Sequence, residues 1–424
     1  MANNVASNFN RKIMETFLDG FESKRNITKN VDTQLFQGKF NPSTGDTIDV
    51  KRPHDYVTSR TSSGDVTSET ASDILSGKAT ATVQDYFTVF VDYDEADEAI
   101  KLNQLDKILD PMSSRIAIDF ETDFAAYMMK NSGLQSGAVG TAITAWAEVA
   151  EAGAIMQSSG VPMDGQWNMA VNPYTNISLA GDQRSLGTSK EVTGANENAV
   201  IADNFAGMRV RTATTLASYT TGSEADRAGT LSGSPTVTYL GAKDTMTQVL
   251  AVTAVGAGST VIKAGETVKV TAASGAINRL NMSTRDQIVN GSGAAIVWTG
   301  VVTTDVTLSG GAGNVTVTGP AIFESGGQYN TVSQAPVSGD VVTFLGSAST
   351  LIQPALFWHK QAFTCASVPI KKLKATDTVA TTADGLQFRV THDSDFIKNQ
   401  QKVRVDFRPA YGVMNPFFAG QAFG

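Results

Sequence analysis

The sequence predicts an α+β fold in which an all-β segment interrupts a host of mixed helices and strands. Only 17% of the 424 residues are charged and 38 are glycine, which favours β-rich structure with many turns. Apolar residues recur at helical spacing in the first half, whereas residues 222–347 contain short alternating strands between glycine turns. Because a single hydrophobic core stops growing at about 250–300 residues, two or more folding units are expected.

The first predicted element is an amphipathic helix over residues 8–24. Its apolar residues recur at helical spacing, while Glu15, Asp19 and Glu22 form an acidic stripe on another face. Most such stripes are simply solvated polar faces, and that is the simpler interpretation here. The apolar face needs a cover, and we expect a neighbouring subunit to provide it.

Residues 45–92 predict an extended hairpin, because two β-type runs flank a polar stretch from Tyr56 to Ser72. Such a hairpin is marginal on its own. Since exposed ion pairs contribute little, its charges are compatible with solvated loop residues or with pairing to a neighbouring subunit. The candidates for pairing are Lys51, Arg52, His54, Arg60, Asp65 and Glu69.

A helix is expected from Asp94 to Leu105, and Asp110-Pro111 predicts the start of a longer one, since the pair supplies an N-cap followed by proline. Apolar residues then recur every four positions from Met112 to Met128. The exposed face of this long helix is predicted to carry Arg115, Asp119, Glu121, Asp123 and Lys130.

The next stretch predicts a compact mixed unit. Residues 144–158 have helical spacing, residues 167–171 form a short strand, and Asn172-Pro173 starts a further helix. Mixed character resumes over residues 355–416, so the β segment between is inserted rather than appended. The strands predicted within it are Thr236–Tyr239, Thr247–Thr253, Thr267–Thr271, Ile296–Val302, Val306–Leu308, Val315–Thr318 and Val341–Leu345.

The sequence offers no convincing constellation for chemistry. Cys365 could pair with His359 or His392, but no local motif supports a nucleophile, and a buried thiol is the simpler interpretation. The glycine-rich stretches match neither a dinucleotide fingerprint nor a phosphate loop, and no zinc-ligand spacing occurs. We therefore expect no catalytic, cofactor or metal site.

Charge and hydropathy limit the partners. The net charge is −8 without a dense Lys/Arg block, which argues against affinity gained by neutralising phosphates. Residues 1–10 lack the apolar core of a signal peptide, and no apolar run approaches the roughly 20 residues that span a membrane. We expect a soluble product made in the cytoplasm.

Several motifs resemble one protein family. They are Lys51-Arg52-Pro53-His54, Arg60-Thr61 with Gly64-Asp65, Ser76-Gly77-Lys78-Ala79-Thr80, Glu98 to Leu105 and Tyr411 to Gly420. With the order of elements, they resemble coat proteins of short-tailed lambdoid phages, the P22-like group, which share the Hong Kong phage capsid fold. The similarity covers nearly the whole chain and is weakest in the β segment.

The resemblance implies a domain plan for the chain. Its parts are an N-terminal arm (1–39), an extended loop (40–92), a peripheral domain with a spine helix (93–143), an axial domain (144–221), an inserted Greek-key β-barrel (222–347), a return to the axial domain (348–384) and the carboxyl-terminal strands of the peripheral domain (385–424).

The resemblance also implies a function and partners. Family members form hexamers and pentamers with a scaffolding protein and a portal, and the resulting procapsid expands as double-stranded DNA is packaged without sequence-specific binding. Scaffolding protein would bind Glu15, Asp19 and Glu22. The segment 278–290, with Arg279, Arg285 and Asp286, is the candidate loop for contact with a neighbouring subunit.

Two other classes fit parts of the sequence. The Thr/Gly-rich β segment is typical of a secreted adhesin or of a phage decoration or tail protein, although the helical first half and the polar amino end count against both. A hydrolase on a β scaffold is the third interpretation, and it lacks a recognisable set of catalytic residues.

Overall fold

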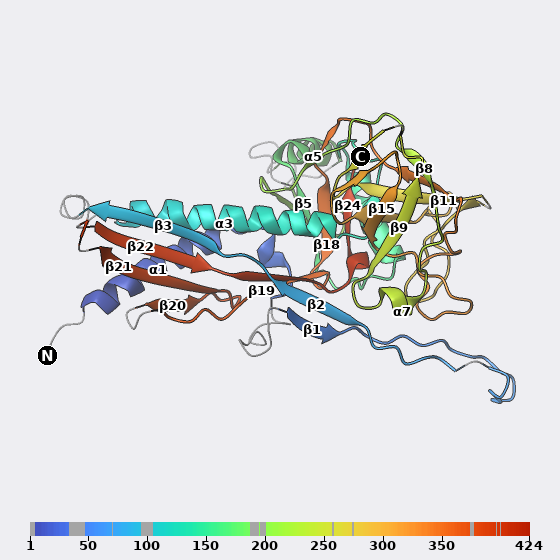
Figure 1. The fold of residues 1–424 in the computed structure, drawn as a ribbon, viewed down its shortest axis with the longest axis horizontal. Coiled ribbons are helices and arrows are strands. Elements are labelled where there is room, and N and C mark those ends of the chain that lie inside the picture. The colour runs from blue at the N-terminus through green and yellow to red at the C-terminus, as the bar shows by residue number, and fades with distance from the viewer. Residues whose placement is uncertain are drawn as a thin grey trace. The chain divides into compact units, whose positions relative to one another are not determined.

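A computed structural model of the chain describes residues 5–33, 47–69, 71–94, 105–186, 195, 201–256, 258–273, 275–373, 377–395, 397–398 and 400–424 (Figure 1). The chain divides into two compact units. Unit 1 comprises Met1–Asp49, Thr80–Ala125 and Phe363–Val413, and unit 2 comprises Val50–Ala79, Ala126–Ala362 and Met414–Gly424. Both combine helices with sheets, which confirms the predicted α+β class. Most of the helix expected from Asp94 to Leu105 lies outside the described residues.

Unit 1 contains an antiparallel sheet of four strands in the order β20-β21-β22-β3. Its strands are β3 (Phe87–Asp94), β20 (Thr378–Thr381), β21 (Gln387–Asp395) and β22 (Gln400–Phe407). Alternation gives the sheet two different faces. Phe388, Val405 and Phe407 are buried on one face, whereas the other carries charged side chains around Asp406.

The apolar face of this sheet is covered by aromatic side chains of α1 (Val5–Lys24) and α3 (Leu105–Lys130). The ring centroid of Phe21 in α1 lies 4.6 Å from that of Phe388 and 6.2 Å from that of Phe120 in α3. Phe120 in turn lies 4.9 Å from Phe407. The amino-terminal helix is therefore covered by its own chain, which contradicts the expectation that a neighbouring subunit covers it.

The long helix differs from its prediction in two respects. It begins at Leu105, so Pro111 lies inside it rather than at its first position, and the carbonyl four residues earlier loses its helical donor. Glu121 does not belong to an exposed face. Its carboxylate is buried and accepts bonds from the amides of Ile27 (2.7 Å) and Thr28 (2.9 Å) and from the Thr28 hydroxyl.

A second sheet has the order β1-β2-β23-β19 and is built mainly from unit 1. Its strands are β1 (Thr47–Lys51), β2 (Lys78–Val83), β19 (Phe363–Ser367) and β23 (Pro409–Val413). The chain between β1 and β2, residues 52–77, is the middle part of the extended loop predicted over residues 40–92, and below the name extended loop refers to this part in the structure. It belongs to unit 2 and contains no strand among its described residues.

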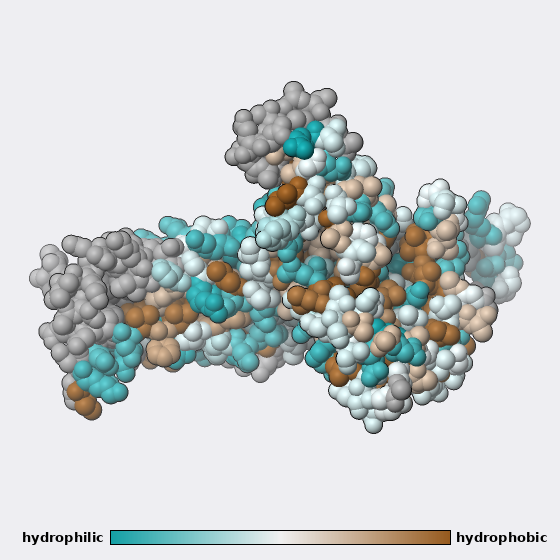
Figure 2. Space-filling view, turned by 90° about the horizontal axis from the view of Figure 1, so that it is seen from above, coloured by the Kyte–Doolittle hydropathy of each residue, from teal (hydrophilic) through white to brown (hydrophobic). Residues whose placement is uncertain are grey.

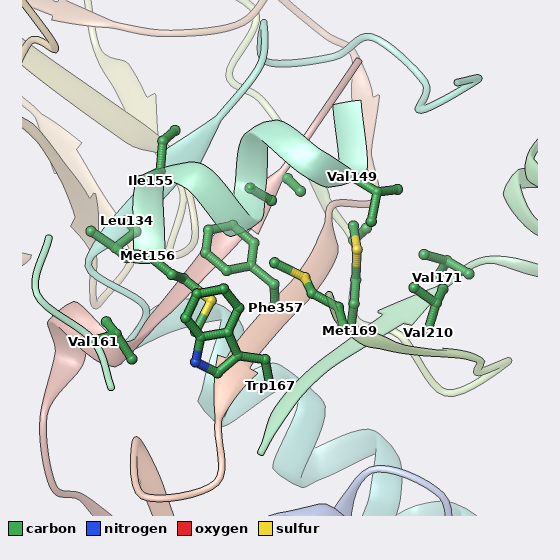
Figure 3. Close-up of a cluster of buried hydrophobic side chains, with 14 of the residues drawn as sticks. Leu134, Val149, Ile155, Met156, Val161, Trp167, Met169, Val171, Val210 and Phe357 are labelled. Atoms are coloured by element: carbon green, nitrogen blue, oxygen red, sulfur yellow. The ribbon is translucent and has the colours of Figure 1, made fainter. Parts of the chain in front are cut away.

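Unit 2 contains a five-stranded mixed sheet in the order β4-β24-β18-β5-β6, packed against α4 (Trp146–Ser158). Figure 3 shows Val149 and Met156 of α4 turned toward Trp167, Met169 and Phe357 of the sheet. The predictions of α4, of β5 (Trp167–Val171) and of α5 (Pro173–Leu186) are confirmed. The other strands are β4 (Leu134–Ser136), β6 (Arg209–Thr212), β18 (Ala355–His359) and β24 (Ala419–Ala422).

The β-rich segment forms a sheet that closes on itself. The order β11-β13-β15-β9-β8-β16 returns to β11 through a pairing of β16, and all these pairs are antiparallel. Inside lies a separate apolar cluster that includes Trp298, whose indole donates to the Gly319 carbonyl at 3.0 Å. The bounds are β8 (Ala228–Leu231), β9 (Thr247–Thr253), β11 (Thr267–Ala272), β13 (Thr299–Val302), β15 (Gly313–Thr318) and β16 (Val341–Phe344), with β12 (Gly275–Ala276) at the edge.

One strand predicted in this segment is wrong. Thr238 instead caps α7 (Tyr239–Ala242), since its side chain accepts a bond from the Gly241 amide. The remaining elements are η1 (Thr28–Asn30) and η3 (Pro416–Phe418), the pair β7 (Tyr219–Thr220) with β17 (Leu351–Ile352), and the pair β10 (Thr260–Ile262) with β14 (Val306–Leu308).

Candidate functional site

The extended loop is the most exposed long segment that the structure describes in unit 2. Four large apolar side chains on it are exposed, with Tyr56 at 58% and Ile74 at 74%, together with Val57 and Val66. Its own cross-links are few: the Val57 amide donates to the Ser72 hydroxyl at 3.0 Å. Apolar groups held in water on so thin an arm are typical of a surface that binds a partner.

Five of the charged residues predicted to pair with neighbouring subunits are exposed in this part of the chain: Lys51, His54, Arg60, Asp65 and Glu69. The Thr67 hydroxyl and amide both donate to Asp65, and these bonds hold the pKa of its carboxyl below the ordinary value. The carboxylate therefore stays charged at neutral pH. These five residues are available for pairing, and that role remains a prediction.

The structure contradicts the same role for Arg52. Only 9% of the residue is exposed, and its guanidinium donates to the carbonyls of Lys78 and Lys243, each at 3.1 Å, and to that of Met414. Burial lowers its pKa, while Tyr239 raises it. Arg52 joins three segments of its own chain and is not available to a neighbour.

Arg279 is likewise a buried side chain. Only 4% of it is exposed, and it donates to the carbonyls of Gly133 and Thr299, each at 3.0 Å. Its guanidinium lies 5.7 Å from the ring centroid of Phe417, and burial lowers its pKa to about 10. The sequence placed Arg279 in a polar contact loop, but its side chain points into unit 2 instead.

Arg285 and Asp286 differ in exposure and in their contacts. Asp286 is exposed and stays a candidate for contact with a neighbour. Arg285 is half-buried, forms an ion pair with Asp55 and donates to the Asn330 carbonyl at 2.9 Å. Its partner therefore comes from the extended loop of the same chain, contrary to the predicted pairing with a neighbour.

The three acids of the α1 stripe differ in their exposure. Glu15 and Asp19 are exposed, whereas Glu22 is half-buried and accepts a bond from the Ala383 amide at 3.3 Å. Two of the three predicted acids of this helix therefore lie in the exposed class, and the third does not.

Figure 2 shows apolar side chains on the displayed face as separate patches between polar surface, with no single large apolar area. Contacts on this face that rely on burial must therefore be spread over several small patches.

The residues considered for chemistry are structural. Cys365 is completely buried, and burial raises the pKa of its thiol, so a nucleophilic thiolate does not form at neutral pH. The His359 Nε2 atom lies 3.1 Å from an oxygen of Asp164. Within the described ranges, no group of three or more His, Cys, Asp or Glu side chains has metal-binding geometry, and no helix has the length and apolar character to cross a bilayer.

Comparison with known proteins gives a full-length match. The family model described as P22 coat protein, gene protein 5, matches residues 1–424. The chain belongs to the P22 coat protein family. A curated major capsid protein of Acyrthosiphon pisum secondary endosymbiont phage 1 is 37% identical over 429 residues and is covered completely, as is this chain.

Two solved structures similar to this coat-family chain are those of a Mycobacterium phage and of a Ralstonia phage. A chain of Mycobacterium phage Che8 has a TM-score of 0.46 and 11% identity, with 94% of this chain and 90% of the other covered. A capsid chain of Ralstonia phage GP4 has a TM-score of 0.43 and 10% identity, with 95% and 90% covered.

Sequence reasoning missed the residues that hold the base of the extended loop. Tyr239, Gln328 and Tyr329 lie in the β-rich segment and contact residues 55–77 from about 160 or more positions away. No local pattern signals such a pairing. The one available sign of this contact was the pair Tyr239 and Tyr329, two aromatic residues among short polar strands. From the sequence alone, such residues are assigned to the core.

Proposed function

We propose that this major capsid protein builds an icosahedral shell as hexamers and pentamers, with help from a scaffolding protein and a portal, and that the procapsid expands as double-stranded DNA is packaged. The match of the coat-protein model to all 424 residues carries this proposal. The chain is a structural subunit of the phage particle and not an enzyme. Its assembly in the host cytoplasm is part of the proposal.

The domain plan goes with this function. We infer a Hong Kong phage-type fold in which residues 1–39 are the arm, 40–92 the extended loop, 93–143 and 385–424 the peripheral domain, 144–221 and 348–384 the axial domain, and 222–347 an inserted Greek-key barrel. The closed ring of antiparallel pairs within 222–347 supports the last of these assignments.

The extended loop is the proposed means of joining subunits. Its exposed apolar side chains have little cover on their own chain, so they lose water only when another surface meets them. Lys51, His54, Arg60, Asp65, Glu69 and Asp286 are the charged candidates for the same contacts. Individually weak contacts become decisive because each subunit of a closed shell repeats them.

Assembly with scaffolding protein tests this proposal. The wild-type chain, co-expressed with its scaffold, should give closed shells by negative-stain electron microscopy. The pair Val66→Ser and Ile74→Ser should leave the subunit folded and soluble but reduce shell yield strongly, because both side chains are exposed in the monomer. As a control, Val249→Ser and Val341→Ser change two exposed valines of the β-rich sheet. A wild-type chain that never forms shells with scaffold would refute the function.

The scaffold-binding site is tested separately. We propose that Glu15 and Asp19 bind basic side chains of the scaffold, with Glu22 contributing from its half-buried position. Glu15→Lys with Asp19→Lys should abolish scaffold-dependent assembly, whereas Glu151→Lys with Asp203→Lys makes the same charge change on exposed residues of unit 2. Normal shells from the α1 variant would refute the assignment.

A further inference from the structure

The two ends of the extended loop are fastened to each other and to the β-rich segment of the same unit. At the base, the Arg52 amide donates to the Gly77 carbonyl at 2.8 Å, and the Arg52 guanidinium reaches the Lys243 carbonyl. The Lys78 amide donates to Asp244 at 3.2 Å. Both ends of the loop are therefore hydrogen-bonded to Lys243 and Asp244, the residues that directly follow α7.

A stacked pair of tyrosines supports this base. The rings of Tyr239 and Tyr329 lie 3.7 Å apart between centroids, at an interplanar angle of 10°. The Asp55 amide donates to the Tyr329 hydroxyl at 3.2 Å. Gly77 approaches so closely that an added Cβ would lie 2.9 Å from the Tyr239 hydroxyl oxygen and 2.7 Å from the Lys243 carbonyl oxygen. The fit of the loop on this surface leaves no room for a side chain at Gly77.

Two further contacts hold the loop just beyond its base. Arg285 pairs with the Asp55 carboxylate. The side-chain amide of Gln328 donates to the Asp73 carbonyl at 2.6 Å. Arg285 has a φ of +61°, in the left-handed region that is unfavourable for a residue with a side chain. Its bonds to Asp55 and to the Asn330 carbonyl accompany that conformation. The two sides of the loop, at Asp55 and at Asp73, are thus held by residues that lie close together in the β-rich segment.

Beyond these contacts the loop has little support. Residues 56–60 and 62–69 are exposed, and the hydrogen bonds of Tyr56, Val57 and Thr67 stay within the loop. The nine Cα–Cα steps from Asp55 to Gly64 can extend about 30 Å. A rotation of about 10° at the base therefore moves the tip by about 5 Å, which is enough to displace it from a contact surface. The contacts at the base of the extended loop therefore determine its direction.

We propose that Tyr239, Arg285, Gln328 and Tyr329 form an intramolecular latch that orders the extended loop before assembly. This inference rests on the proposed function, since it takes the loop to be the joining arm. A loop already ordered in the free subunit loses less conformational freedom when it binds its neighbour. In this way the β-rich segment speeds assembly, although its four latch residues do not contact the neighbouring subunit.

The experiment measures loop order in the free subunit. Because Cys365 is completely buried, cysteines introduced at Ser63 in the loop and at Ser234 in the β-rich segment can be labelled selectively with nitroxides. Pulsed electron paramagnetic resonance then gives the distribution of distances between the labels. The latched loop should give one narrow distribution in otherwise unmodified protein.

Arg285→Ala with Tyr329→Phe removes both contacts to Asp55 while keeping the aromatic stack. We expect a broad distance distribution and assembly with scaffold that is slower by on the order of tenfold, from the loss of two contacts. Gln287→Ala is the matched control, because Gln287 is exposed, lies two residues from Arg285 and forms its backbone bridge with Leu280. Asp55→Ala attacks the same contacts from the loop side and serves if the first variant misfolds.

The outcomes separate the latch from the function. A narrow distribution that survives both latch variants would overturn the inference, and so would broad loops that assemble at the wild-type rate. Failure of the wild type to assemble would refute the proposed function instead, because the distance distribution of the free subunit still reports the latch.

Discussion

The aromatic core of unit 1 gives the sharpest test of how the amino-terminal helix is held. The substitution is Phe21→Ala. The side chain of Phe21 is completely buried, and its ring centroid lies 4.6 Å from Phe388, 6.0 Å from Phe407 and 6.2 Å from Phe120. Its removal leaves a cavity lined by these three rings from three different elements and by the ring of Phe17, 6.3 Å away on the same helix, and the three separate elements limit how far the site can collapse.

Truncation of a buried phenylalanine typically costs about 3–5 kcal/mol. Phe21 belongs at the middle of this range, because three of the rings around it are held by other elements. A loss of about 4 kcal/mol lowers the folding equilibrium constant of unit 1 about a thousandfold. Since a chain with two units need not unfold in one step, the loss is expected in the transition that includes β21 and β22.

The assay is urea unfolding of the free subunit, combined with amide hydrogen exchange of β21 and β22. Lys24→Ala, on the exposed last turn of the same helix, is the control and should change stability by less than about 0.5 kcal/mol. If α1 found its cover only on a neighbouring subunit, Phe21→Ala would leave the free subunit unchanged. A loss below about 1 kcal/mol would therefore refute the packing described for unit 1.

Three further predictions concern buried polar groups. Glu121→Ala strands the amides of Ile27 and Thr28 without their acceptor, at a cost of about 1–3 kcal/mol for each, and hydrogen exchange at these two amides should accelerate. Burial works to raise the pKa of Asp406, but bonds from two arginines and a threonine outweigh it and the pKa is lowered. The stability that Asp406 contributes is therefore present above its ordinary pKa of about 3.9 and is lost as the pH falls through the lower folded value, so the stability gap between wild type and Asp406→Asn should close in acid unfolding. Cys365 should resist a thiol reagent in the native subunit and react at once in denaturant, because burial raises its pKa; fast native labelling would contradict its position.

The sequence by itself determined the local elements of this protein. The helix α1, the run from α4 through β5 to α5, and most strands of the β-rich segment follow from the spacing of apolar residues and from the turn residues between them. These signals act over a few residues, so they survive without knowledge of the fold. The same signals misplaced the start of α3, because a local Asp110-Pro111 pattern competes with packing along the whole helix.

Tertiary structure alone decided which groups meet. Arg52 and Arg279 look like surface charges in the sequence, yet both are buried by segments more than 100 positions away. Glu121 looks like an exposed helix residue, yet it accepts two amides close to the end of α1. A polar side chain can be buried only where partners satisfy its hydrogen bonds, and those partners are brought together by the folded chain rather than by neighbouring residues.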